Sequence, residues 1–198
     1  MDVCCYKCRR YRCANAEKKQ PMNIVLIGYR CTGKSSVGER LSRVLRLSFY
    51  DTDTLIEKLT GKTIQAMVDE KGWGFFRERE KEVIKSLATT KKSVIATGGG
   101  AVMDQENVNV LKKNGALVWL TADVDTIIKR MQAEADSTKR RPPLSRDTLI
   151  EETTRILGER VPVYRRLADF SLDTVGKGID EIAYEVCQFL ERCGWERG

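Results

Sequence analysis

The chain has 198 residues, 41% hydrophobic and 32% charged, which is ordinary for a globular protein and favours a single domain. It contains no apolar run long enough to span a membrane and no histidine, which excludes histidine bases, histidine triads and histidine-ligated metal sites. The net charge is +7, but residues 1–20 carry +4 and the other 178 residues only +3, so the charge gives no reason to expect nucleic-acid binding.

Residues 1–20 are basic and rich in cysteine. They hold four of the seven cysteines, at positions 4, 5, 8 and 13, without the paired C-x2-C spacing of most zinc sites. They also lack the apolar stretch of a secretory signal. We expect a disordered extension here, with a metal or partner site as the alternative, followed by one domain at 21–198. An odd number of cysteines argues against a disulfide framework and favours a cytoplasmic location.

The next segment carries the most specific motif, the phosphate-binding loop G-x-x-x-x-G-K-S at residues 28–35. The apolar run Asn23–Ile27 predicts a buried strand before it, and apolar residues at helical spacing predict a helix at 35–45. Glycines let the backbone wrap an anion, and N–H groups at the helix N-terminus point at phosphate oxygens. Lys34 supplies charge to the β- and γ-phosphates, and the Ser35 hydroxyl can ligate Mg²⁺. The motif therefore predicts binding of a nucleoside triphosphate with Mg²⁺.

Strands and helices alternate along the rest of the chain. Short apolar runs predict strands at 47–50, 93–97, 116–121 and 170–173. A capping box predicts a short helix from 54 to about 61, and apolar stripes predict helices at 75–87, 124–131 and 182–190. This order predicts an α/β fold with a mostly parallel sheet, helices on both faces, and ligands beyond the carboxyl ends of the strands.

Three further motifs follow predicted strands or lie on predicted helices. Asp51 and Asp53 end the second strand, where they could serve Mg²⁺ and a substrate hydroxyl; a solvated turn with a helix N-cap explains them equally well. Three glycines at 98–100 would let the backbone approach a ligand closely. Arg77 and Glu80 lie one helical turn apart and can pair. Most helical arginines are solvated, but two that converge would suit a carboxylate.

In this order the motifs resemble those of the shikimate kinases, a P-loop family related to nucleoside monophosphate kinases. The resemblance covers about residues 22–192 and rests on the segments at 28–35, 51–53, 76–77, 97–102, 141–142 and 164–166. It implies a three-layer fold with a five-stranded parallel sheet of order 2-3-1-4-5, a substrate lobe at about 54–80 and a lid at about 132–146. It also implies ATP-dependent phosphorylation of the 3-hydroxyl of shikimate, a step toward chorismate and the aromatic amino acids. Such an enzyme is expected to be a monomer that binds neither nucleic acid nor membrane.

The resemblance also implies a role for individual residues. Lys34, Asp53 and Arg141 would be catalytic, with Asp53 as the base and Arg141 as a lid residue that reaches the transferring phosphate. Ser35 and Asp51 would hold Mg²⁺. The ATP-binding residues would be Gly28, Cys31, Thr32, Gly33, Lys34, Ser35, Ser36, Arg130 and Arg141, with Arg130 near the adenine. The shikimate-binding residues would be Asp53, Arg77, Gly99, Gly100 and Arg165, with the two arginines on the carboxylate.

Two positions depart from the family pattern, and three alternatives stay open. Cys31 stands where the family often has a small residue, and the segment at 173–177 lacks the family's arginine and proline. The alternatives are a kinase for another hydroxylated acid such as gluconate, a nucleotide kinase, and a non-catalytic ATP-binding module. The arginine pair with Asp53 favours a carboxylate that bears neighbouring hydroxyls. No motif supplies a base pocket, and the combined presence of Lys34, two aspartates and Arg141 counts against a non-catalytic module.

Overall fold

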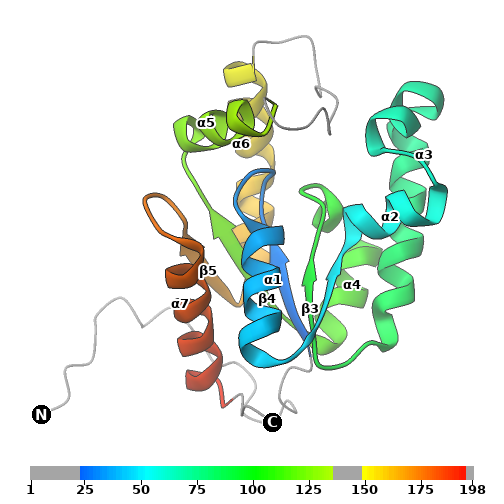
Figure 1. The fold of residues 1–198 in the computed structure, drawn as a ribbon. Coiled ribbons are helices and arrows are strands. Elements are labelled where there is room, and N and C mark those ends of the chain that lie inside the picture. Colours follow the sequence, from blue (N-terminus) through cyan, green and yellow to red (C-terminus); the bar gives the residue numbers. More distant parts are fainter. Residues whose placement is uncertain (1–22, 136–148, 195–198) are drawn as a thin grey trace, which may run out of the picture.

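A computed structural model describes residues 23–135 and 149–194 of the chain, which form a three-layer α/β fold (Figure 1). All strand pairs are parallel, and the strand order is β2-β3-β1-β4-β5. The strands are β1 (Asn23–Ile27), β2 (Ser48–Asp51), β3 (Ser93–Ala96), β4 (Gly115–Thr121) and β5 (Phe170–Asp173). The predicted fold class and strand order are therefore confirmed.

The central strands are buried on both faces, because helices cover each side of the sheet. Every residue of β1 and β3 is buried. Side chains alternate across a strand, so Ile24 and Leu26 point to one face and Val25 and Ile27 to the other. In the register of the sheet, Val25 aligns with Ile95 on β3 and with a residue of β4. The carboxyl ends of these three strands therefore meet at one edge.

Seven α-helices and two short 3-10 helices connect the strands in the described residues. The α-helices are α1 (Lys34–Leu45), α2 (Thr52–Thr60), α3 (Ile64–Ser86), α4 (Gln105–Asn114), α5 (Val124–Ala135), α6 (Leu149–Leu167) and α7 (Ile179–Arg192). The 3-10 helices are η2 (Leu87–Thr89) and η3 (Ala101–Met103). α1 and α7 pack on one face of the sheet, whereas α4, α6 and the end of α3 pack on the other. No helix in these residues is long and apolar enough to cross a membrane.

The helices α2 and α3 form a side lobe that includes residues 54–80, and the role of this lobe in binding substrate stays a prediction. The lobe has a small core of its own, to which Ile56, Ile64, Met67 and Phe76 belong. α3 is interrupted at Gly72, whose φ of 76° and ψ of 171° are not helical. The half of the helix after the kink returns to the main sheet, where Ile84 joins the core.

Three expectations need comment. The capping box was wrong: Asp51, not Thr54, caps α2 by accepting hydrogen bonds from two backbone N–H groups, so the helix begins at Thr52. The helices α4 and α6 were not predicted from apolar stripes, and α6 contains Pro162. The expected extension at 1–20 lies outside the described residues, and so does the expected lid apart from residues 132–135 at the end of α5.

Candidate active site

The phosphate loop at residues 28–35 joins β1 to α1 with a backbone that requires glycine. Gly28 and Gly33 have φ values of 139° and 91°. A Cβ on Gly28 would lie 2.4 Å from the carbonyl oxygen of Leu120, so no side chain fits there. Gly33 caps α1 without a side-chain hydrogen bond. The first N–H groups of α1 are therefore not covered by a capping side chain, as an anion site at a helix N-terminus requires.

The lysine of the loop lies against the loop's own backbone. Lys34 is only 7% exposed, and its Nζ donates to the carbonyl oxygen of Tyr29 at 2.6 Å. The Thr32 hydroxyl donates to the same oxygen at 2.8 Å. Cys31, which lies between Tyr29 and Thr32 in the loop, has a left-handed φ of 59°. The ammonium group is thus held within reach of phosphates bound by the loop.

Two side chains whose oxygen atoms could bind a metal ion lie together where β2 ends beside the first turn of α1. The Ser35 hydroxyl donates to Oδ2 of Asp51 at 2.6 Å, while Oδ1 of Asp51 caps α2. Mg²⁺ prefers oxygen ligands and takes only one or two from the protein, with water and phosphate completing its shell. The described residues contain no cluster of three or more Asp, Glu, Cys or His that would offer another metal site. Ser35 and Asp51 therefore fit the Mg²⁺ site expected for them.

A cavity opens beside the phosphate loop. It brings together segments that are far apart in the sequence: the loop, α2, both halves of α3, the triple glycine and α6. Its lining residues are Tyr29, Arg30, Asp53, Ile64, Trp73, Phe76, Arg77, Glu80, Gly98, Gly99, Gly100 and Arg160. The expected substrate residues Asp53, Arg77, Gly99 and Gly100 are thus gathered at one place.

The triple glycine makes room for charged side chains of the cavity. A Cβ on Gly98 would lie 2.6 Å from Oε1 of Glu80 and 2.8 Å from Oδ1 of Asp53. A Cβ on Gly100 would lie 2.3 Å from Nη2 of Arg77. Any side chain at these two glycines would displace an acid or the arginine. The glycines therefore leave space for these charged side chains, and they also expose the backbone to the cavity.

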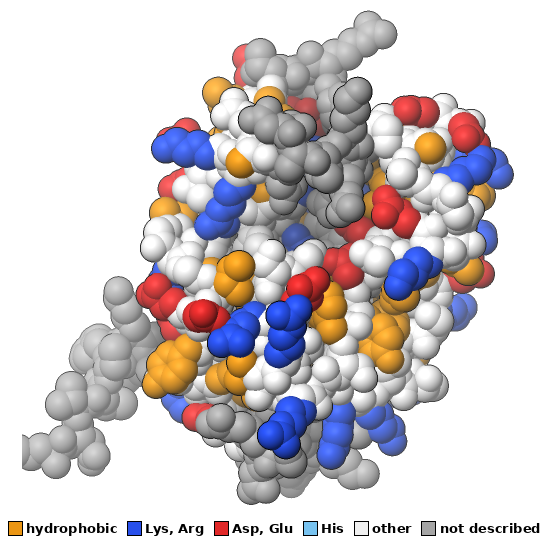
Figure 2. Space-filling view, in the orientation of Figure 1, with side chains coloured by type: hydrophobic (Ala, Val, Ile, Leu, Met, Phe, Trp, Pro, Cys, Tyr) orange, Lys and Arg blue, Asp and Glu red, His pale blue; other side chains and the backbone are white. Residues whose placement is uncertain are grey.

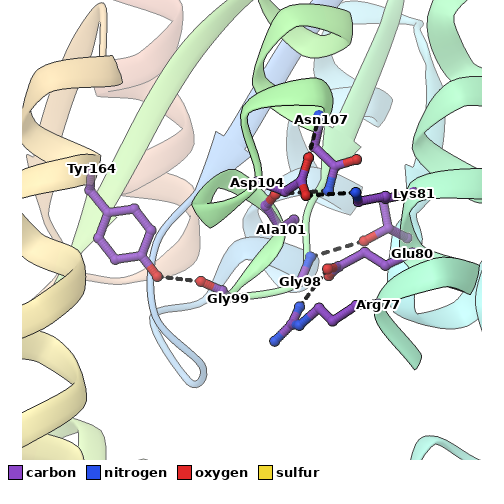
Figure 3. A network of polar contacts seen from close by, with 10 residues as sticks. Arg77, Glu80, Lys81, Gly98, Gly99, Ala101, Asp104, Asn107 and Tyr164 are labelled. Atoms are coloured by element: carbon purple, nitrogen blue, oxygen red, sulfur yellow. Dashed lines mark hydrogen bonds and ion pairs between the residues drawn. The ribbon is translucent and has the colours of Figure 1, made fainter. Parts of the chain in front are cut away.

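Arg77 is held in place by a carboxylate and two aromatic rings. Its Nη1 pairs with Oε2 of Glu80 (Figure 3). Its guanidinium lies 5.1 Å from the ring centroid of Phe76 and 5.9 Å from that of Trp73. Glu80 is 1% exposed, and its Oε1 has no hydrogen-bond partner among the described residues. Burial raises the pKa of Glu80, and Arg77 acts in the opposite direction.

Arg160, not Arg165, is the arginine that α6 contributes to the cavity, which Arg30 of the phosphate loop also lines. Arg165 is exposed and does not line the cavity. Five residues turn an α-helix through about 140°, so Arg160 and Arg165 lie on different faces of α6. Arg160 instead shares the inward face with the buried Ile156 and Tyr164, four residues before and after it. That i, i+4 stripe is the signal in the sequence that identifies the correct arginine.

The remaining expected ATP residues lie around the loop. Arg130 donates to the carbonyl oxygen of Cys31 at 3.2 Å and to both oxygens of Thr174, which follows β5, at 2.8–2.9 Å. Ser36 is exposed in the first turn of α1. Arg141 lies outside the described residues. Tyr29, Arg30 and Trp73 line the cavity although no motif singled them out.

Comparison with known proteins identifies the family. The family model for shikimate kinase matches residues 30–191. A shikimate kinase of Syntrophus aciditrophicus is 47% identical over 172 residues, which cover 83% of this chain and 88% of that protein. One of Pelotomaculum thermopropionicum is 41% identical, over 85% of this chain and 95% of its own length. The chain belongs to the shikimate kinase family.

Solved structures agree with this assignment. The structure of a shikimate kinase from Acinetobacter baumannii in complex with shikimate matches with a TM-score of 0.82 and 31% identity, over 88% of this chain and 96% of that one. A gluconokinase from Sinorhizobium meliloti matches with a TM-score of only 0.55 and 18% identity. The second likeness shows a common fold and nothing finer, so it does not favour gluconate over shikimate.

Proposed function

We propose that this chain transfers the γ-phosphoryl group of ATP to the 3-hydroxyl of shikimate, giving shikimate 3-phosphate and ADP. The observation that carries the proposal is the cavity beside the phosphate loop, which joins Asp53 to two arginines, Arg77 and Arg160. Guanidinium groups match a carboxylate in geometry and charge, and Asp53 suits a hydroxyl. A small polyhydroxylated acid is the ligand class that uses all three.

The phosphoryl transfer follows from these placements. The loop N–H groups and Lys34 bind the ATP phosphates, while Arg77 and Arg160 orient the acid so that its hydroxyl faces the γ-phosphorus. The hydroxyl oxygen forms a bond to phosphorus as the bond to the bridging oxygen of ADP breaks, and Asp53 accepts the hydroxyl proton. Mg²⁺ held by Ser35 and Asp51 would neutralise phosphate charge. Arg141 is proposed as the residue that contacts the transferring group from the lid.

The experiment that tests this function is coupled ADP release with a panel of acceptors. We expect turnover with shikimate and little with gluconate, other hydroxy acids or nucleoside monophosphates. Shikimic acid methyl ester is a matched control, because it keeps every hydroxyl and removes only the carboxylate charge. Equal rates for ester and acid would contradict the arginine assignment, and turnover with gluconate alone would favour the other small-acid kinase.

The two aspartates of the site are expected to fail differently when changed to asparagine. Asp53→Asn keeps the shape but removes the proton acceptor, so kcat should fall by about 10²–10⁴-fold with ATP binding intact. Asp51→Asn should mainly raise the Mg²⁺ concentration needed for half-maximal rate, because an amide binds a hard cation less well. Initial rates across shikimate, ATP and Mg²⁺ concentrations separate the two. A normal kcat for Asp53→Asn would mean that the proton goes directly to phosphate or water.

We also propose that the enzyme acts as a monomer in the cytoplasm, without nucleic-acid or membrane partners. The odd number of cysteines supports a reducing compartment. Light scattering of the purified chain would test the monomer, and a stable dimer would contradict it.

A further inference from the structure

A buried tyrosine forms a hydrogen bond with one of the residues that line the cavity. Tyr164 lies on α6, one turn after Arg160, and is 0% exposed. Its hydroxyl donates to the carbonyl oxygen of Gly99, in the triple glycine that lines the cavity (Figure 3). One hydrogen bond therefore joins the helix that carries Arg160 to the glycine segment that follows β3.

Arg160 belongs to the same cluster. A Cβ placed on Gly99 would lie 3.5 Å from Nη1 of Arg160, so the guanidinium lies close over this glycine. The guanidinium also lies 5.7 Å from the ring centroid of Tyr29. Arg160, Tyr164 and Gly99 thus form a compact group at the edge of the cavity, with the ring of Tyr29 beside the arginine.

The protonation state of the phenol is consistent with its hydrogen bond to Gly99. Burial raises the pKa of Tyr164 to about 12, while the charge and a hydrogen bond of Arg160 act in the opposite direction. The phenol is therefore protonated at neutral pH. Its proton goes to the Gly99 carbonyl, which can only accept, and the Arg160 guanidinium lies close to that same glycine.

We propose that Tyr164 is a positioning residue for substrate binding, which fixes the Arg160 guanidinium and the Gly99 backbone relative to one another. The inference rests on the proposed function, because it assigns the held arginine to the shikimate carboxylate. A free arginine side chain samples many rotamers, and ordering it on binding weakens affinity. A guanidinium that lies over a glycine fixed by the phenol avoids part of that loss and presents its N–H groups to the carboxylate.

A purely structural role for Tyr164 makes a different prediction. Its ring packs against Trp119 of β4, with ring centroids 5.8 Å apart, and it belongs to the core on that face of the sheet. If core packing were its whole purpose, phenylalanine would serve almost as well for substrate binding. Any loss would then appear in stability and would affect both substrates alike.

The test compares Tyr164→Phe with the unmodified chain. We measure kcat, KM for shikimate, KM for ATP, and the Kd of shikimate by calorimetry. Loss of the hydrogen bond that fixes Gly99 beside Arg160 should raise KM and Kd for shikimate up to about tenfold, with kcat and KM for ATP nearly unchanged. Trp119→Phe is the control: it disturbs packing against the same ring and keeps the hydroxyl, so the melting temperature should fall while shikimate affinity stays.

A double-mutant cycle identifies the partner of the hydroxyl. In an Arg160→Met background, Tyr164→Phe should change shikimate KM little further, because the group it positions is gone. Unchanged shikimate affinity in Tyr164→Phe, an equal loss for both substrates, or a full effect in the Arg160→Met background would each overturn the inference. If the unmodified chain does not phosphorylate shikimate, the proposed function fails and this inference with it; with an active unmodified chain, only the inference is at stake.

Discussion

At the scale of the residue, Arg160 and Arg165 show how position on a helix decides which charge meets a ligand. Both are arginines on α6, five residues apart. Arg160 lies on the inward face of the helix and lines the cavity, whereas Arg165 is exposed to solvent. Arg77 reaches the same cavity from another helix, where Glu80 and two aromatic rings hold it. The cavity therefore offers two fixed guanidinium groups from two different elements.

These three arginines form a matched set for mutation. Arg77→Ala and Arg160→Ala should each raise KM for shikimate about ten- to hundredfold, since a hydrogen bond to a charged group contributes about 1.5–3 kcal/mol. KM for ATP should change far less. Arg165→Ala removes the same charge from the exposed face of α6 and should behave like the unmodified chain. Steady-state kinetics with both substrates checks this, and an effect of Arg165→Ala as large as that of Arg160→Ala would contradict the corrected assignment.

Glu80 should make stability depend on pH. Burial raises its pKa above the ordinary value of 4.5. As the pH rises above 4.5, the unfolded chain ionises Glu80 before the folded chain does, so the stabilisation that this group gives at low pH is lost. Glu80→Gln lacks that loss. The free energy of unfolding of the variant, minus that of the unmodified chain, should therefore increase from pH 4.5 to 7.

Urea unfolding across this range measures the difference. Glu78→Gln, at an exposed position of α3, controls for the removal of one charge. A difference between Glu80→Gln and the unmodified chain that shrinks as the pH rises would contradict the direction of the pKa shift.

At the scale of the element, α3 is two helices joined at a glycine. Gly72 has a φ of 76° and a ψ of 171°, a conformation that side chains disfavour strongly. The residue after it, Trp73, lines the cavity at the start of the second half. The kink thus determines where the ring of Trp73 and the guanidinium of Arg77 lie. Gly74, two residues on, has ordinary helical geometry.

Gly72 and Gly74 provide a matched pair of substitutions. A Cβ would meet nothing within 4 Å at either position, so only backbone conformation distinguishes them. Gly72→Ala should lower the free energy of unfolding by about 1–3 kcal/mol and raise KM for shikimate, because the kink must strain or relax. Gly74→Ala should raise stability by about 0.5–1 kcal/mol. Denaturant unfolding and steady-state kinetics measure these effects. Equal effects of Gly72→Ala and Gly74→Ala would mean that a side chain at the kink causes no strain.

At the scale of the whole molecule, the parallel sheet assembles the site. Segments after β1, β2 and β3 supply the phosphate loop, the aspartates and the triple glycine, and all three strands end at the same edge. The helices α3 and α6 then add one arginine each. On the face in Figure 2, both acidic and basic side chains of the described residues are exposed.

The domain should work without residues 1–20. The described fold starts with β1 at Asn23, and the family match starts at residue 30. Deleting residues 1–20 should leave kcat and both KM values nearly unchanged. Kinetics of the deletion variant, together with metal analysis of the full chain, tests this. A collapse of activity, or stoichiometric zinc removed by a chelator, would favour the alternative of a metal or partner site in the cysteine-rich segment.

From the sequence we could predict the phosphate loop, the five strands, their mostly parallel arrangement and the motifs that hold Asp53, Arg77 and the triple glycine. Each of these depends on local patterns: glycines where the backbone turns left-handed, apolar runs where strands are buried, and motifs at strand ends that a parallel sheet brings to one edge. The strand order came from the likeness of the ordered motifs to a family. None of this required knowing which side chains face each other.

The packing of the elements was needed to show that Arg160 joins Arg77 in the cavity, that Asp51 caps α2, and that Tyr164 reaches Gly99. The capping box at Thr54 was locally reasonable and wrong, and Arg165, expected at the substrate carboxylate, lies at an exposed position of α6 outside the cavity lining. The cap depends on where β2 ends, and the arginine on which face of α6 packs against the sheet. Tyr164 and Gly99 are 65 residues apart in the sequence. Side-chain contacts of this kind depend on the packing of whole elements, which fixes rotation and distance, and a local pattern contains neither.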